Sequence, residues 1–106
     1  MPKYLIQGSY SNEGLKGLLE EGGSKRREAA EQATKRAGGR LEAFYYAFGK
    51  NDFVIIVDLP GNVDATALSL TANASGAVNS RITVLITPEE VDQATKKTVK
   101  FRPPGK

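Results

Sequence analysis

The stretch FYYAFGKNDFVIIVDLP, residues 44–60, decides the fold because it predicts two strands joined by a tight turn. Residues 44–48 are aromatic or apolar and residues 53–57 are aromatic or β-branched, which is the composition of strands. Between them, residues 49–52 begin with glycine and end with aspartate, two residue types that favour turns. We therefore expect a hairpin at the centre of the chain.

The other elements are predicted from periodicity and from capping residues. They are a strand at 3–10, a helical region from 12 to 37 interrupted by the pair Gly22 and Gly23, a strand at 40–48, a helix at 63–75 capped by Asn62, a strand at 79–86 and a helix at 88–97. The strongest local signal is TPEE at 87–90, which predicts a capping box with proline in the first turn.

The order of these elements predicts an α+β fold. A strand, a helix, two strands, a helix and a strand match the ferredoxin-like βαββαβ arrangement, with a four-stranded antiparallel sheet. Right-handed crossovers place both helices on one face of that sheet. We expect a single domain over residues 1–106, with a core at 1–87 and a C-terminal helix and extended arm at 88–106.

Both hairpin strands are apolar on both faces, which predicts an assembly. In residues 40–48, one expected face carries Leu41, Ala43, Tyr45 and Ala47, and the other carries Glu42, Phe44, Tyr46 and Phe48. Helices cover only one face of the sheet, so the second face would leave a large apolar patch in water. We expect a homodimer packed sheet to sheet, a dimeric α+β barrel, with the terminal helix and arm reaching the partner.

Composition excludes several classes of chemistry. The chain has neither Cys nor His, which excludes disulfides, thiolate catalysis, His-based acid–base catalysis and the usual zinc and haem ligation. No acidic residues have a recognised metal-binding spacing, so we expect no cofactor and no metal. No segment has the apolar length of a signal peptide or a membrane span, so we expect a cytoplasmic protein with no membrane partner.

The net charge of +3 is unevenly distributed along the chain. Through Thr95 there are ten basic and twelve acidic residues, a net charge of −2, and the last eleven residues carry five basic ones. The body is therefore not a basic platform, which argues against a nucleic-acid partner, as does the absence of an RNA-recognition strand motif. The basic tail is either an arm for a partner or a set of solvated charges.

Several short sequences resemble the GYD domain family. The hairpin sequence FGKNDFV at 48–54 resembles the motif for which the family is named, and similar matches occur at KYLI (3–6), GGSKRR (22–27) and DLP (58–60). The resemblance covers nearly the whole chain and implies a bacterial, ferredoxin-like protein of the dimeric α+β barrel type with no assigned reaction. Asn51 stands where the family motif has tyrosine, so no phenol role is carried over to that position.

Candidate site residues are the polar side chains that could face a pocket between helices and sheet, or the interior of the dimer. Asp58 is the candidate catalytic base, provided that burial raises its pKa. Asp52 is a weaker candidate, because a turn residue can cap its own backbone. The candidate ligand-binding residues are Arg26, Lys25, Arg81, Tyr4, Tyr10, Tyr45 and Tyr46. Tyr45 and Tyr46 are adjacent on a strand and should point to opposite faces.

Two interpretations of Arg26 stay open. On a continuous helix it lies on one stripe with Leu15, Leu19, Ala29 and Ala33, where a guanidinium needs an acidic partner or a bound anion. If the glycine pair resets the helical phase, Arg26 faces water. Lys25 and the amides of residues 22–24 could also meet a phosphate, but the spacing is not that of a Walker loop.

Two functions are compatible with the sequence. The first is a dimeric protein that binds a small anionic ligand, or a cofactor-free enzyme built on the same pocket. The second is a non-enzymatic oligomerisation or interaction module that uses the basic C-terminal arm. The sequence leaves open whether the protein is an enzyme.

Overall fold

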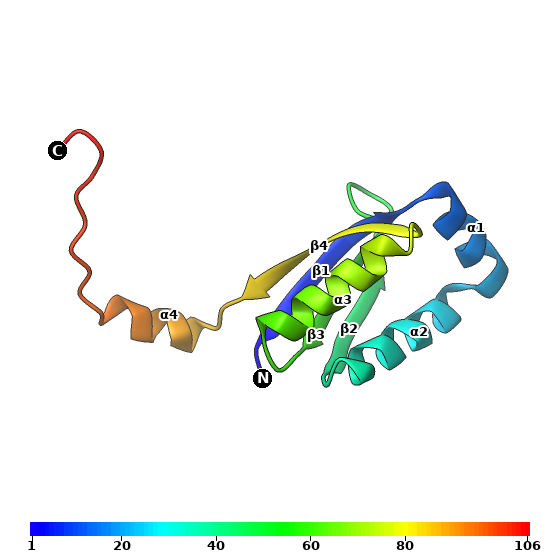
Figure 1. Cartoon of the computed structure of the whole chain (residues 1–106), viewed down its shortest axis with the longest axis horizontal. Coiled ribbons are helices and arrows are strands. Elements are labelled where there is room, and N and C mark those ends of the chain that lie inside the picture. Colours follow the sequence, from blue (N-terminus) through cyan, green and yellow to red (C-terminus); the bar gives the residue numbers. More distant parts are fainter.

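A four-stranded antiparallel sheet forms the body of the molecule in the computed structural model, which describes residues 1–106 (Figure 1). The elements are β1 (Lys3–Tyr10), α1 (Asn12–Glu21), α2 (Gly23–Arg36), β2 (Arg40–Tyr46), β3 (Phe53–Asp58), α3 (Asn62–Ala74), β4 (Val78–Leu85) and α4 (Pro88–Thr95). The strand order is β2-β3-β1-β4. The expected α+β class and four-stranded antiparallel sheet are therefore confirmed.

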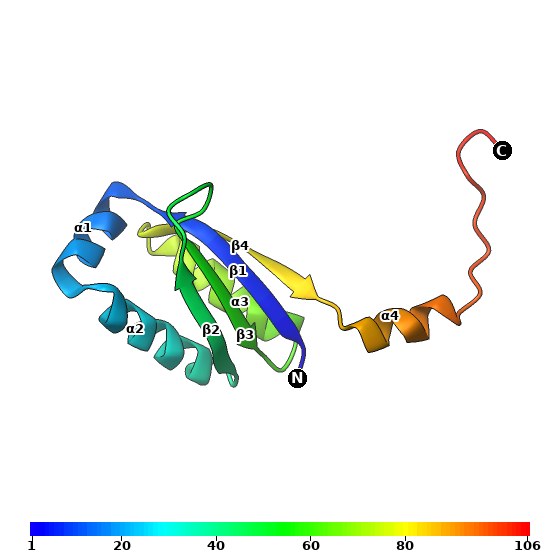
Figure 2. The same cartoon turned by 180° about the vertical axis from the view of Figure 1, so that it is seen from behind.

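The small core lies between one face of the sheet and the helices. Its buried apolar side chains alternate along the two central strands and continue into the start of α3, and they are Tyr4, Phe53, Ile55, Val57, Leu59 and Ala65. Helix α2 packs on β2 and α3 packs on β4. The opposite face of the sheet has no helix over it (Figure 2).

A β-bulge in β2 changes the prediction of which residues share a face. Leu41 is the register partner of Val57 and Ala43 is the partner of Ile56, so the intervening Glu42 has no partner on β3. Leu41 therefore packs against the core with the helices. The expectation that Leu41 shares a face with Ala43 is wrong, because it assumed an unbroken alternation.

The hairpin is confirmed, but its first strand ends at Tyr46 rather than at Phe48. Phe48 has a φ of 52°, in the left-handed region that a strand does not visit. The N–H of Ala47 donates to the carbonyl oxygen of Asp52 at 2.9 Å and closes the loop. The two strands are thus joined by a loop longer than a two-residue turn.

Gly22 separates two helices. Its φ of 83° ends α1, and its N–H donates to the carbonyl oxygen of Leu18 at 2.8 Å. Helix α2 then begins at Gly23. The continuous stripe from Leu15 to Ala33 therefore does not exist, and α2 starts with its own phase.

Asn62 is the first residue of α3 and not its cap. The N-cap position is occupied by Gly61. The side-chain oxygen of Asn62 instead accepts a hydrogen bond from the hydroxyl of Tyr4 at 2.7 Å. The expected capping role is wrong because a tertiary partner competes for that side chain.

The C-terminal segment extends away from the body (Figure 1). Its start is the predicted capping box: Thr87 Oγ1 accepts from the N–H of Glu90, and Glu90 Oε1 accepts from the N–H of Thr87, both at 3.1 Å. The apolar side chains of Val91, Val99 and Phe101 are exposed. None of the four helices combines the length and the apolar character that crossing a membrane requires.

Candidate functional site

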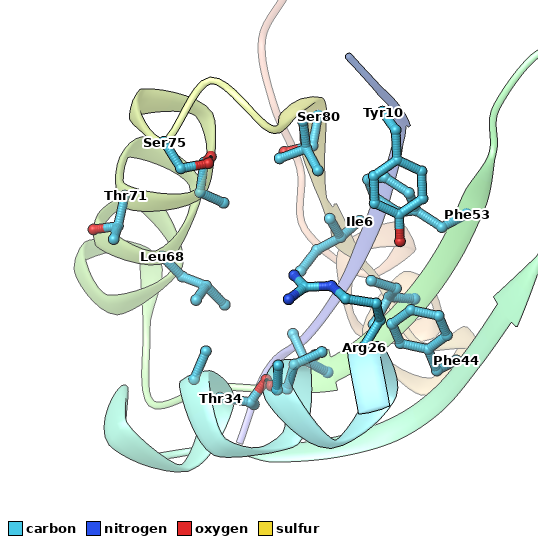
Figure 3. Close-up of a pocket in the computed structure, with 17 residues that line it drawn as sticks. Ile6, Tyr10, Arg26, Thr34, Phe44, Phe53, Leu68, Thr71, Ser75 and Ser80 are labelled. Atoms are coloured by element: carbon cyan, nitrogen blue, oxygen red, sulfur yellow. Dashed lines mark hydrogen bonds between the residues drawn. The ribbon is translucent and has the colours of Figure 1, made fainter. Parts of the chain in front are cut away.

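A cavity of about 330 Å³ lies between α2, α3 and the sheet (Figure 3). Twelve of its seventeen lining residues are hydrophobic, so its wall is mainly apolar. Its volume is at the lower end of the range for small-molecule pockets. The mouth lies between the two helices, where Ala29 and Thr71 are exposed.

Small side chains on α2 leave this space open. Ala29, Ala30 and Ala33 contribute the α2 wall, and Leu68 on α3 lies across from them. Alanine fills little volume, and the two helices pack on different strands, so neither closes the gap over the centre of the sheet. The cavity thus exists because α2 carries no large side chains at these positions.

Aromatic rings form much of the floor. Tyr10, Phe44 and Phe53 project from β1, β2 and β3 on the helix-covered face. The rings of Tyr10 and Phe53 meet edge to face with centroids 5.3 Å apart, a favourable geometry for two quadrupoles. These contacts fix the floor in place without a ligand.

Arg26 extends from α2 into this apolar cavity (Figure 3). Its nearest acidic group is Glu21, with Nη1 and Oε2 3.7 Å apart, and the two side chains are 38% and 47% exposed. Such a pair contributes little, because water screens it. No acidic residue is among those that line the cavity. Both interpretations of Arg26 were thus partly right: the phase is reset, yet the guanidinium still meets the cavity.

Tyr10 is a neutral phenol beside Arg26. Burial raises the pKa of Tyr10 to about 12; the neighbouring hydroxyl of Tyr46 adds to this, and the positive charge of Arg26 opposes it. Tyr46 itself donates from its hydroxyl to the carbonyl oxygen of Gly23 at 3.1 Å, which ties β2 to the start of α2. At neutral pH Tyr10 therefore keeps its proton and can donate it in a hydrogen bond.

Three of the four other hydroxyls that line the cavity already have protein partners; one of them, Ser75, donates to the carbonyl oxygen of Ala72 at 2.6 Å. Thr34 is buried and donates to the carbonyl oxygen of Ala30 at 2.7 Å. Ser80 donates to Asn73 Oδ1 at 3.1 Å. These groups complete the protein's own hydrogen bonds, so Arg26 and Tyr10 are the polar pair best placed to meet a ligand.

The other predicted ligand-binding residues lie elsewhere. Tyr4 is buried beneath the start of α3 and bonded to Asn62. Tyr45 is 70% exposed and, like Arg81, lies on the uncovered face of the sheet. Lys25 is exposed on α2 and does not line the cavity. The structure brings together Arg26 and Tyr10, with Tyr46 adjacent, and separates the remaining candidates.

Asp58 is the centre of an ion cluster on the uncovered face. Its carboxylate accepts from Lys3 Nζ at 2.9 Å and from Arg40 Nη2 at 3.0 Å. The hydrogen bond from Lys3, followed by that from Arg40, lowers the pKa of Asp58 despite its burial. The condition under which Asp58 would act as a base, a raised pKa, is therefore not met.

Asp52 binds the neighbouring strand rather than its own turn. Its Oδ2 accepts from the N–H of Tyr10 at 2.9 Å, and its own N–H donates to the carbonyl oxygen of Gly8 at 2.7 Å. These two bonds fix the end of β1, and with it the position of the Tyr10 ring. Asp52 is thus a positioning residue for the cavity floor.

The apolar lining was not foreseen as a site. Ile6, Phe44, Phe53 and Leu68 looked like core residues in the sequence. The one signal that could have found the cavity is the set of three alanines at 29, 30 and 33 facing a hairpin of large side chains. No group of three or more acidic side chains is close enough together to hold a metal ion.

Comparison with known proteins gives one result beyond this geometry. No curated protein and no solved structure matches the chain. The family model of the GYD domain matches residues 4–95, which include the four strands, except Lys3 at the start of β1, and both helices that wall the cavity. Since that match covers most of its length, the chain belongs to the GYD domain family.

Proposed function

We propose that this protein binds a small anionic molecule in the cavity between α2, α3 and the sheet. The observation that carries the proposal is the guanidinium of Arg26 in an apolar wall that contains no acidic residue. A cation in apolar surroundings favours a bound anion, because the charge is only partly solvated there. The screened contact with Glu21 does not meet this need.

A related proposal is that the same cavity is the active site of a cofactor-free enzyme. A guanidinium beside a neutral phenol is suited to stabilising an oxyanion. The lining offers no carboxylate and no histidine that would abstract a proton from a substrate. The geometry therefore supports binding better than turnover.

We also propose that the protein is a homodimer of the ferredoxin-like, dimeric α+β barrel type. The strand order β2-β3-β1-β4 is the one that two crossed βαβ units produce. The uncovered face carries Leu5, Val54 and Ile56 between its polar residues. Only 9 of 106 residues are buried in the single chain, fewer than a domain of this length normally hides, which supports a second layer on that face.

The dimer is tested by equilibrium sedimentation at micromolar concentration. We expect a dimer for the native chain and a monomer for Ile56→Lys, whose charge would lie in the sheet-to-sheet contact. Leu19→Lys is the matched control, because Leu19 is 86% exposed on α1. A monomeric native chain would overturn the dimer and leave the cavity proposal standing.

Ligand binding is tested by recording amide chemical shifts while a panel of small anions is added. We expect shifts confined to α2, α3 and the floor of the cavity. Ala33→Phe should abolish them, because the ring fills the cavity while Arg26 stays in place. Ala74→Phe, on the exposed side of α3, is the control. The absence of any anion-dependent shift in the cavity would overturn the proposed function.

A second candidate function is favoured by the C-terminal segment. Helix α4 and the residues after it project from the body with exposed apolar side chains and five basic residues. A segment of this kind is suited to an acidic partner protein. Removal of residues 96–106 would then abolish capture of that partner while the unfolding transition stays in place; unchanged capture would remove this candidate.

A further inference from the structure

We propose that the ligand of the cavity is a small aromatic monocarboxylate, held with its carboxylate between Arg26 and Tyr10 and its ring between the alanines of α2 and the floor of the sheet. This inference rests on the proposed anion-binding function and adds the chemical class. It follows from the charge, the hydrogen-bond geometry and the shape of the lining, taken in turn.

The charge of the cavity matches a single negative charge. Arg26 is the only basic residue in the lining, and no acidic residue offsets it. A phosphate or a polyphosphate carries more charge and is usually bound by several cations or by a cluster of backbone amides. Lys25, the nearest basic residue before Arg26, is exposed and outside the lining. A monoanion is the ligand that this wall can neutralise.

The donors favour a carboxylate. A guanidinium presents two parallel N–H groups, which match the two oxygens of a carboxylate. The hydroxyl of Tyr10 points toward the side of the cavity on which Arg26 lies (Figure 3). Because Tyr10 keeps its proton at neutral pH, it is a donor and not a competing anion. Together they offer an anion a forked cation and one neutral hydrogen-bond donor.

The walls of the cavity favour a ligand with a planar apolar group. Ala29, Ala30 and Ala33 form a low wall on α2, while Phe44 and Phe53 present rings from the sheet. A planar ring can lie between such walls and make offset or edge contacts with the floor, which are more favourable than contacts of a saturated ring of similar size. With about 330 Å³ available, the apolar part of the ligand consists of one or two rings.

The probe is benzoate, measured by isothermal titration with amide shifts as the location check. Its comparisons are benzyl alcohol, which lacks the charge, cyclohexanecarboxylate, which lacks the aromatic ring, and inorganic phosphate. We expect benzoate to bind at least about tenfold more tightly than benzyl alcohol or phosphate, and several-fold more tightly than cyclohexanecarboxylate, as loss of a charged hydrogen bond or an aromatic contact implies.

Variants assign the contacts. Arg26→Gln should lower the affinity for benzoate at least about tenfold, to the affinity for benzyl alcohol. Tyr10→Phe should lower the affinity for benzoate several-fold. Arg27→Gln is the control, because Arg27 is on the same helix but faces Glu31 with Nε and Oε1 4.0 Å apart. If circular dichroism shows that Arg26→Gln does not fold, Arg26→Lys replaces it. Lysine keeps the positive charge but lacks the two parallel N–H donors of the guanidinium, so we expect an intermediate affinity for benzoate.

The outcomes separate the ligand class from the proposed function. If phosphate binds through Arg26 and benzoate does not compete, the class is wrong and the anion site remains. If benzyl alcohol binds as tightly as benzoate, or if Arg26→Gln and Arg26→Lys leave benzoate affinity unchanged, the carboxylate contact is wrong. If cyclohexanecarboxylate binds as tightly as benzoate, the proposed preference for an aromatic ring is wrong. If no anion shifts the cavity amides, both the class and the proposed function fall.

Discussion

Lys3 and Asp58 face each other directly across β1 and β3, and Lys3 Nζ donates to Asp58 Oδ1 at 2.9 Å. Arg40 on β2 reaches the other carboxylate oxygen at 3.0 Å. Asp58 therefore joins three adjacent strands at one end of the uncovered sheet face. Its charge links the strands of the sheet, and Asp58 does not line the cavity on the opposite face.

The first prediction concerns the pH dependence of stability. The pKa of Asp58 is lower in the folded chain than its ordinary value of 3.8, so its ionised form stabilises the fold above that pH. This contribution is lost as the pH falls through the folded pKa. Asp58→Asn should lower Tm by a few degrees at pH 7, and the difference should shrink as the pH falls below 3.8, as followed by circular dichroism.

Asp92→Asn is the control for this experiment, since Asp92 lies in α4 and its side chain makes no ion pair. It should leave Tm unchanged at every pH. A Tm difference for Asp58→Asn that stays constant from pH 7 to pH 2 would contradict the role of the ion cluster.

The second prediction concerns Tyr10. Its folded pKa of about 12 lies above the ordinary value of 10.0, so its neutral form contributes stability that is complete below pH 10 and is lost as the pH rises toward 12. Absorbance at 295 nm should show a late tyrosine ionisation near pH 12. Tyr10→Phe should remove that late phase, whereas Tyr45→Phe should retain it. A late phase that survives in Tyr10→Phe would refute the assignment.

The third prediction compares two glycines. A Cβ on Gly39 would overlap the backbone carbonyl of Asp58, so Gly39→Ala should destabilise the fold by about 1–3 kcal/mol. A Cβ on Gly17, inside α1, would meet no atom within 4 Å, so Gly17→Ala should stabilise by about 0.5–1 kcal/mol. Urea unfolding measures both changes. Equal effects of the two substitutions would contradict the close approach at Gly39.

The fourth prediction concerns α4, which has no extensive packing against another helix or strand of the chain. Thr87→Ala removes the capping oxygen and should cost about 0.5–2 kcal/mol of local helix stability. Amide exchange in residues 88–95 should then accelerate, while the Tm of the body stays unchanged. A lowered Tm would mean that α4 packs on the body or on a partner chain.

Much of the fold could be predicted because its signals are local. The hairpin, the glycine break and the capping box of Thr87 and Glu90 depend on residues close together in the chain, and all three are confirmed. The bulge at Glu42 and the bond from Tyr4 to Asn62 depend on residues that meet only after folding. Local patterns give no information about such competitors.

The candidate site was predicted only in part for a similar reason. Arg26 stands out because a charge among alanines is unusual, whereas Tyr10 is only one of several polar side chains that could face a pocket. Tyr45, Arg81 and Asp58 belong to the same set of polar candidates, but the pleat places them on the other face of the sheet. Chemical type alone does not separate these candidates, whereas the alternation of side chains along a strand, which separates Tyr45 from Tyr46, does.

The bulge in β2 also bears on how other chains should be aligned to this one. Glu42 has no partner, so a relative that lacks this residue would keep Leu41 opposite Val57 and Ala43 opposite Ile56 in a regular ladder. In β1, whose pairing with β3 and β4 is unbroken, loss of one residue would turn every following side chain to the other face. We therefore expect length variation within the family at position 42 and none in β1.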